Sequence, residues 1–197
     1  MKRDGQPPGS IFSARRLGLA VLAALLLVLA LRLFVVHSYR VTSHAMSETI
    51  LPGDWVLVSR LSYNFGDPRR GDVVCFTSPG AGGQDFFGRL IALGGETLEI
   101  RDGLVYIDGA AEPLDEPYVS HTRREDYGPV VVPEGRLFIL GDNRAEARDS
   151  RVWGPLDAGL VHGEALGIFF SSDPYAVSLW PIPEAEVRWE RIAEPID

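Results

Sequence analysis

The sequence predicts a mainly β domain that follows one N-terminal apolar helix. Three observations support this prediction. Residues 17–31 carry no charge and are almost entirely Leu, Ala and Val. Beyond residue 36, short segments alternate between apolar and polar residues with a period of two, which is typical of strands. Gly and Pro separate these segments and no long stretch has helical periodicity, so we expect an antiparallel β domain with closed or barrel-like sheets.

The first element is an apolar stretch of twenty residues at 17–36, which is long enough to span a bilayer as a helix. Arg32 interrupts it near the far end, where its side chain can reach the lipid headgroups. The stretch is preceded by four basic residues, Lys2, Arg3, Arg15 and Arg16, which predict a cytoplasmic N-terminus. A cleaved signal peptide is the alternative, but the stretch is long for one and no Ala-x-Ala-like site follows it.

These features divide the chain into three parts. We expect a cytoplasmic tail at 1–16, a transmembrane helix at 17–36 in contact with membrane lipid, and a β domain at 37–197 outside the cytoplasm. Residues 1–37 hold five Lys or Arg and one Asp, a net charge of +4. The remainder holds 14 Arg and 26 Asp or Glu, a net charge of −12, which argues against nucleic acid as a partner.

Lysine and cysteine each occur only once in the sequence, and both scarcities limit the possible chemistry. Lys2 is the only lysine, and the other long basic side chains are arginines, which stay protonated in proteins. Cys75 is the only cysteine, which excludes an intramolecular disulfide, and its apolar surroundings predict a buried thiol. No Cys/His spacing resembles a zinc site, so the sequence predicts neither a metal nor a cofactor.

The strands of the outer domain are expected in seven segments. Alternation predicts strands within 54–61 and 71–78, and a flexible Gly-rich loop at 79–84 separates the second from the next. Short runs at 85–93, 96–103 and 104–109 follow, and Asp102-Gly103 between the last two is a hairpin signal. Further strands are expected within 135–143 and 163–170.

Four segments occur in a characteristic order behind the apolar stretch. They are Ser-His-Ala-Met with Leu-Pro-Gly-Asp at 43–54, Arg-Arg-Gly-Asp-Val-Val at 69–74, the run at 86–109 followed by 114–119, and Gly-Asp-Asn-Arg…Asp-Ser-Arg-x-x-Gly at 141–154. In order and spacing they resemble type I signal peptidase, the membrane serine protease that removes signal peptides from exported proteins. The resemblance covers residues 11–197. It implies a bacterial-type cytoplasmic membrane location and signal peptides or preproteins as partners.

The resemblance also implies a chemistry. In this family a Ser nucleophile works with a Lys general base, and burial lowers the pKa of that Lys so that it can accept the hydroxyl proton. The substrate is an extended peptide laid along strand edges, with small residues at the cleavage end.

This chain departs from the family at the positions that perform the chemistry. The nucleophile position holds Ala45, the general-base position holds Gly88, and a position where a Ser supports the base holds Ala147. No catalytic residue is therefore intact. Ser43 matches the position whose hydroxyl helps to hold the oxyanion. Met46 either forms a wall of the substrate pocket, as in the family, or is an apolar group that contacts the membrane.

The residues around these positions are retained, and we expect them to support the site. Asp142, Asn143 and Arg144 either face the substrate or shape a turn. Arg89, Asp149 and Arg151 are expected to form a charge network, with Ser150 in the same box.

The sequence leads to one main hypothesis and two alternatives. The main hypothesis is a non-hydrolytic homologue of signal peptidase with a binding or scaffolding role. The first alternative is an active peptidase with an unrecognised nucleophile such as Ser43, assisted by His121 or His162. The second is an engineered inactive variant, although a lost base and a domain without lysine are more typical of sequence drift.

Overall fold

The computed structural model describes residues 10–34, 36–80, 82–173 and 187–196. The chain separates into two compact units, Met1–Val36 and His37–Asp197. The first unit contains helix α1 (Ser10–Phe34), which begins within the segment predicted as a tail. Residues 11–16 contain no Gly or Pro, so the helix continues back to the Pro7-Pro8-Gly9 sequence. Residues 1–9 of the predicted tail lie outside the described residues.

Helix α1 presents apolar side chains to its surroundings. Between residues 17 and 28, eight large apolar side chains are exposed: Leu17, Leu19, Val21, Leu22, Leu25, Leu26, Leu27 and Val28. No helix in the part of the chain that the structure describes has both the length and the apolar character needed to cross a membrane.

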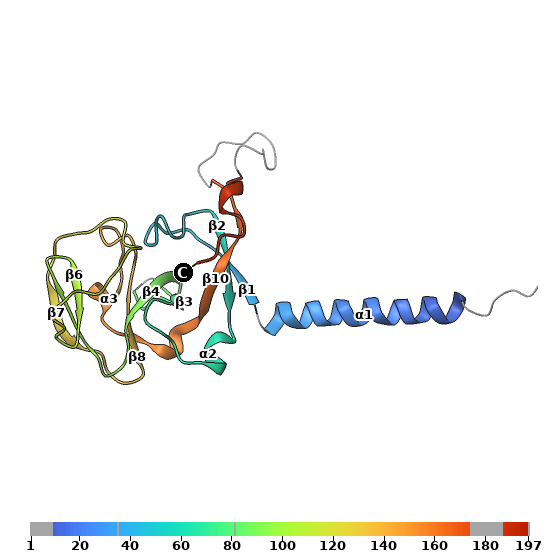
Figure 1. The fold of residues 1–197 in the computed structure, drawn as a ribbon, viewed down its shortest axis with the longest axis horizontal. Coiled ribbons are helices and arrows are strands. Elements are labelled where there is room, and N and C mark those ends of the chain that lie inside the picture. The colour runs from blue at the N-terminus through green and yellow to red at the C-terminus, as the bar shows by residue number, and fades with distance from the viewer. Residues whose placement is uncertain (1–9, 35, 81, 174–186, 197) are drawn as a thin grey trace, which may run out of the picture. The chain divides into compact units, whose positions relative to one another are not determined.

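The second unit is built mainly from antiparallel strands, as predicted. In the described part of the chain, seven of them form a sheet with the order β1-β2-β10-β3-β4-β8-β9. Their bounds are β1 Val36–Arg40, β2 Asp54–Ser59, β3 Val73–Thr77, β4 Asp85–Ala92, β8 Arg136–Leu140, β9 Leu156–Asp157 and β10 Val161–Ser171. Figure 1 shows β10, in orange, beside its partner β2. Among the described strands no ladder joins β1 to β9, so backbone pairing does not close this sheet into a ring.

A second, three-stranded sheet has the order β6-β5-β7, with β5 Thr97–Arg101, β6 Leu104–Ile107 and β7 Tyr127–Val131. The predicted hairpin is confirmed, because β5 and β6 pair antiparallel across Asp102 and Gly103. Both turn residues have positive φ, of 51° and 83°, which is typical of two-residue hairpin turns. The sequence did not predict β7, which contains Gly128 and Pro129; Pro is tolerated because β7 lies at the edge of its sheet.

Short helices connect the strands: α2 (Ser62–Phe65), α3 (Ser150–Trp153), η1 (Ala158–Leu160) and η3 (Trp189–Arg191). Apolar side chains from the sheets pack into three buried clusters. One of them joins β3, β4, β8 and β9 and includes Phe76, Leu90 and Ile139. The predicted burial of Cys75 is confirmed, and burial raises the pKa of its thiol.

Strand β10 enters the sheet between β2 and β3, which requires close contact at Gly163. This residue pairs with Cys75 of β3, and any Cβ atom placed on it would overlap the carbonyl oxygen of Ser59, which ends β2. Only a residue without a side chain allows the backbones to approach this closely.

Gly163→Ala is therefore expected to lower the free energy of unfolding by about 1–3 kcal/mol, the usual effect of overpacking a buried site. Denaturant unfolding of the full chain in detergent measures this loss. Gly66→Ala is the matched control, since a methyl group there would make only an ordinary contact of 3.6 Å with the carbonyl oxygen of Ser62. Equal stability of the two variants would contradict the expectation.

Candidate functional site

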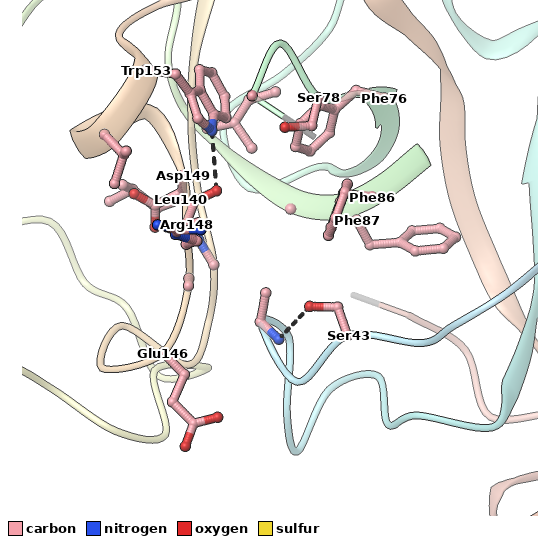
Figure 2. A pocket seen from close by; sticks show the side chains of 17 residues that line it. Ser43, Phe76, Ser78, Phe86, Phe87, Leu140, Glu146, Arg148, Asp149 and Trp153 are labelled. Atoms are coloured by element: carbon pink, nitrogen blue, oxygen red, sulfur yellow. Dashed lines mark hydrogen bonds between the residues drawn. The ribbon is translucent and has the colours of Figure 1, made fainter. Parts of the chain in front are cut away.

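A cavity of about 360 Å³ lies between the segment that follows β1, strand β4 and the region from β8 to α3. Figure 2 shows Ser43 on one side of it, Trp153 and Leu140 on the other, and Phe86 and Phe87 on the strand between them. Most of its lining is apolar and comes from Phe76, Phe86, Phe87, Ile139, Leu140, Val152 and Trp153. Such a size and character are ordinary for a ligand-binding cavity.

The three residues that the sequence predicted at the catalytic positions all line this one cavity: Ala45, Gly88 and Ala147. They reach it from three distant parts of the sequence. The backbone N–H of Asn143 donates to the carbonyl oxygen of Ala45 at 3.0 Å, which holds the two segments together. A Cβ atom on Gly141 would overlap that of Ala147 and lie 2.5 Å from the Ala45 carbonyl oxygen. Gly141 thus permits the close approach of Ala45 and Ala147.

The space beside Gly88 is filled by neighbouring side chains. A Cβ atom on Gly88 would lie 2.5 Å from Ile139 Cγ2 and 3.2 Å from Phe76 Cε1. The strand register explains this geometry. Gly88 pairs with Val74, and Leu90, two residues further along β4, pairs with Ile139. Phe76 and Ile139 therefore lie diagonally across from Gly88 on the same sheet face. Ile139 is fully buried, and the direction in which a side chain at position 88 would leave the backbone is blocked.

Ser43 faces the same cavity and is half-buried. Its hydroxyl oxygen accepts a hydrogen bond from the backbone N–H of Ala45 at 3.1 Å, the bond drawn in Figure 2. His162 has other partners: its Nε2 lies 2.8 Å from Thr77 Oγ1 and 2.9 Å from Asp85 Oδ1. The side chain of His121 is exposed. Ser43 therefore keeps a hydroxyl in the cavity, while the ring of His162 is engaged on strands β3 and β4.

A buried ion pair, Arg89–Asp142, is bonded to the segment that carries Ala45. Arg89 donates to Asp142 through Nε at 3.0 Å and through Nη2 at 2.9 Å, and both side chains are almost fully buried. Thr49 donates to the same carboxylate at 2.7 Å, and the N–H of Asp142 donates to the sulfur of Met46 at 3.4 Å. The guanidinium of Arg89 also lies over the ring of Tyr118, at 3.9 Å from its centroid. These bonds connect β4 to the two segments that carry Ala45 and Ala147.

A second ion pair, Arg151–Asp149, lies within the 141–154 box. Arg151 donates to Asp149 through Nε at 2.8 Å and through Nη2 at 2.7 Å, and it also pairs with Glu125. Burial opposes the charge on Arg151, but the hydrogen bonds and negative charges of Asp149 and Glu125 raise its pKa above the ordinary value. Asp149 accepts from the N–H of Gly141 at 3.1 Å, and Ser150 Oγ accepts from the N–H of Ile139 at 2.9 Å.

The remaining box residues shape the turn. Arg144 Nε donates to the carbonyl oxygen of Gly141 at 3.1 Å, and its guanidinium pairs with Glu116 in a buried bridge at 2.5 Å. Asn143 Nδ2 donates to the carbonyl oxygen of His44 at 3.2 Å. Arg89 and Asp149 were expected in one network; the structure places them in two pairs, Arg89 with Asp142 and Asp149 with Arg151.

Sequence reasoning missed several residues of the site. Glu116 and Glu125 lie in a region without strand periodicity, so nothing in the sequence indicated their arginine partners. Ile139 and Phe76 were expected only as strand residues, and their position beside Gly88 depends on sheet register. Among the described residues, no group of three or more His, Cys, Asp or Glu is arranged to hold a metal ion.

Comparisons with known proteins identify the family of this chain. The sequence profile described as "Signal peptidase, peptidase S26" matches residues 14–170. The chain is 39% identical to a probable signal peptidase I-1 of Synechocystis sp. over 157 residues, 76% of this chain and 79% of that protein. It is 34% identical to signal peptidase I T of Bacillus subtilis over 144 residues, 68% of this chain and 73% of that protein. A crystal structure of a signal peptidase I from Enterococcus faecalis V583 is 35% identical, with a TM-score of 0.45, and covers 50% of this chain and 97% of that one.

The antiparallel β domain, with the 141–154 box packed beside the Ala45 segment, defines a signal-peptidase-like scaffold. The chain belongs to the signal peptidase family, peptidase S26.

Proposed function

We propose that this chain is a non-hydrolytic signal peptidase homologue that binds extended peptides, such as signal peptides of preproteins, outside a bacterial cytoplasmic membrane. One observation carries the proposal: Ala45, Gly88 and Ala147, which the resemblance assigns to the positions of nucleophile, base and base-supporting Ser, line a single cavity. A methyl group cannot attack a carbonyl, and a glycine cannot accept a proton. Residues 37–197 contain no lysine that could take over the role of the base.

The packing beside Gly88 supports the loss of hydrolysis. Ile139 and Phe76 fill the space that the first carbon of a basic side chain would need. A recent single substitution of a larger residue by Gly88 would leave an empty space where its side chain had been. Here Ile139 and Phe76 occupy that space. This arrangement favours an evolved loss of the base over an engineered knockout at one position.

The peptide-binding part of the proposal rests on a strand edge. The half of β4 at residues 85–88 pairs with β3 on one side, and among the described strands β8 joins the other side only from Arg89 onward. An extended peptide could add to this edge by backbone hydrogen bonds beside the cavity. The ion pairs Arg89–Asp142 and Arg151–Asp149 then hold the groove walls.

Residues 17–36 are proposed to anchor the chain, with the N-terminus inside. The proposal rests on the uncharged run at 17–31 and on the four basic residues before it.

The full chain in detergent is expected to leave a bacterial preprotein intact during prolonged incubation. Removal of one member of a cooperating nucleophile–base pair costs on the order of 10⁶ in turnover in a well-dissected serine protease. Gel analysis of the preprotein measures this directly, and an active signal peptidase serves as the positive control. Cleavage at the signal-peptide site that Ser43→Ala abolishes would instead establish the rewired enzyme.

In parallel, a signal peptide carrying a photo-crosslinker is expected to label the chain, and an excess of unlabelled peptide is expected to compete. A peptide of the same composition in scrambled order is the control. Equal labelling by the scrambled peptide would contradict the binding role.

A further inference from the structure

The cavity beside Ala45 has more room than a small peptide side chain needs. Its volume is about 360 Å³, whereas an engineered cavity of roughly 150 Å³ already holds benzene. Ala45, Gly88 and Ala147, which stand at the catalytic positions of the family, are among the smallest residues of its lining. A Ser at position 45 or 147 would place a hydroxyl group at the cavity wall. Ala has no such group, so the cavity is wider at these two positions.

The inner lining of this cavity is apolar and offers little to a charged or polar ligand. Phe76, Ile139 and Leu140 are buried core residues that present their surfaces to it. The carboxylate of Asp149 is already bonded by Arg151 and by the N–H of Gly141. Glu146 and Arg148 are exposed, and in Figure 2 the carboxylate of Glu146 points away from the other labelled side chains. Such a lining favours a large apolar group.

The same cavity opens beside a strand edge, which indicates that the apolar group belongs to a peptide. Phe86, Phe87 and Gly88 line the cavity and lie in the half of β4 that β8 does not cover. A peptide paired with this edge presents alternate side chains to one face of the sheet. One of them would enter the cavity while its backbone stays on β4.

We propose, resting on the function proposed above, that this groove selects extended peptides with a large apolar side chain, such as Phe, Leu or Trp, opposite Ala45. The small residues implied for hydrolytic members of the family would leave the cavity unfilled. The catalytic positions of the family thereby become a specificity pocket for bulky side chains.

The test measures binding of fluorescent nine-residue peptides to the full chain in detergent by anisotropy. The peptides share one backbone, and the residue before the former cleavage bond is Ala, Leu, Phe or Trp. We expect the Phe peptide to bind at least about 10-fold more tightly than the Ala peptide, within the range that added apolar groups give in protein pockets. N-methylation of the peptide backbone beside that residue is expected to weaken binding by a similar factor, whereas free indole is expected to bind far more weakly than the Trp peptide.

Two variants make the test specific to the cavity. Ala147→Leu narrows the cavity and is expected to abolish the preference for Phe while the Ala peptide still binds. Ala145→Leu is the matched control, because Ala145 is exposed and does not line this cavity, and it is expected to keep the full preference. Val152→Trp fills the cavity from an exposed position and serves if Ala147→Leu impairs folding.

The outcomes separate the two proposals. Equal binding of the Ala and Phe peptides, or tighter binding of the Ala peptide, would overturn the bulky preference and leave peptide binding intact. Binding of free indole as tight as that of the Trp peptide, or indifference to N-methylation, would also overturn the inference, because the strand edge would then contribute nothing. Failure of every peptide to bind would overturn both.

Discussion

A chain carrying Ala45→Ser together with Gly88→Lys is expected to remain unable to cleave a preprotein. The Lys stem would have to leave position 88 through the space held by Ile139 Cγ2 and Phe76 Cε1, at 2.5 and 3.2 Å from the added Cβ. Overpacking of this kind typically costs about 1–3 kcal/mol. The new Lys would therefore be displaced from the nucleophile or would destabilise the sheet. The turnover of the double variant should stay on the order of 10⁶ below that of an intact nucleophile–base pair, measured as preprotein cleavage beside an active signal peptidase.

The packing explanation can be checked apart from catalysis by a double-mutant cycle. Gly88→Ala is expected to destabilise the full chain, and its effect should shrink or vanish when Ile139→Ala removes the clashing methyl group. Ile139→Ala alone should cost about 2–5 kcal/mol, because it truncates a fully buried side chain. Additive effects in denaturant unfolding would show that Ile139 does not restrict position 88. Efficient cleavage by the Ala45→Ser, Gly88→Lys variant would contradict the explanation that Ile139 and Phe76 exclude a side chain at position 88.

Arg89→Met is expected to cause the largest loss of stability among single polar substitutions near the site. It leaves the carboxylate of Asp142 buried without its guanidinium partner, and breaking a buried pair in this way costs about 3–5 kcal/mol. Thr49 would still donate one hydrogen bond to that carboxylate, but a neutral hydroxyl does not balance its charge. The measurement is the free energy of unfolding of the full chain in detergent.

Arg101→Met is a closely matched control for this prediction. Arg101 also pairs with a carboxylate, that of Glu99 at 3.6 Å, and also lies over a tyrosine ring, that of Tyr106 at 3.6 Å. Its ion pair is exposed, and such pairs contribute about 0–1 kcal/mol. The comparison therefore isolates burial as the cause. A loss from Arg89→Met no larger than that from Arg101→Met would refute the structural role of the buried pair.

Much of the β domain could be predicted because its signals are local. Alternation of side chains within 54–61, 85–93 and 135–143 depends only on neighbouring residues, and so does the Asp102-Gly103 turn. The edge strand β7 was missed since Gly128 and Pro129 weaken the local signal. The position of β10 between β2 and β3 could not be predicted, because strand order depends on contacts between residues about a hundred positions apart.

The candidate site also has features that the sequence predicted and features that only the folded structure revealed. Ala45, Gly88 and Ala147 were identified from motifs, each of which lies within a few consecutive residues, and the absence of lysine from the domain was visible in the sequence. Their convergence on one cavity, the pairing of Arg144 with Glu116, and the methyl group of Ile139 beside Gly88 followed from folding alone. The sequence motifs identify which side chain is missing at each position. The register of β8 on β4 decides what occupies the space that it leaves, because that space is bounded by a strand distant in the sequence.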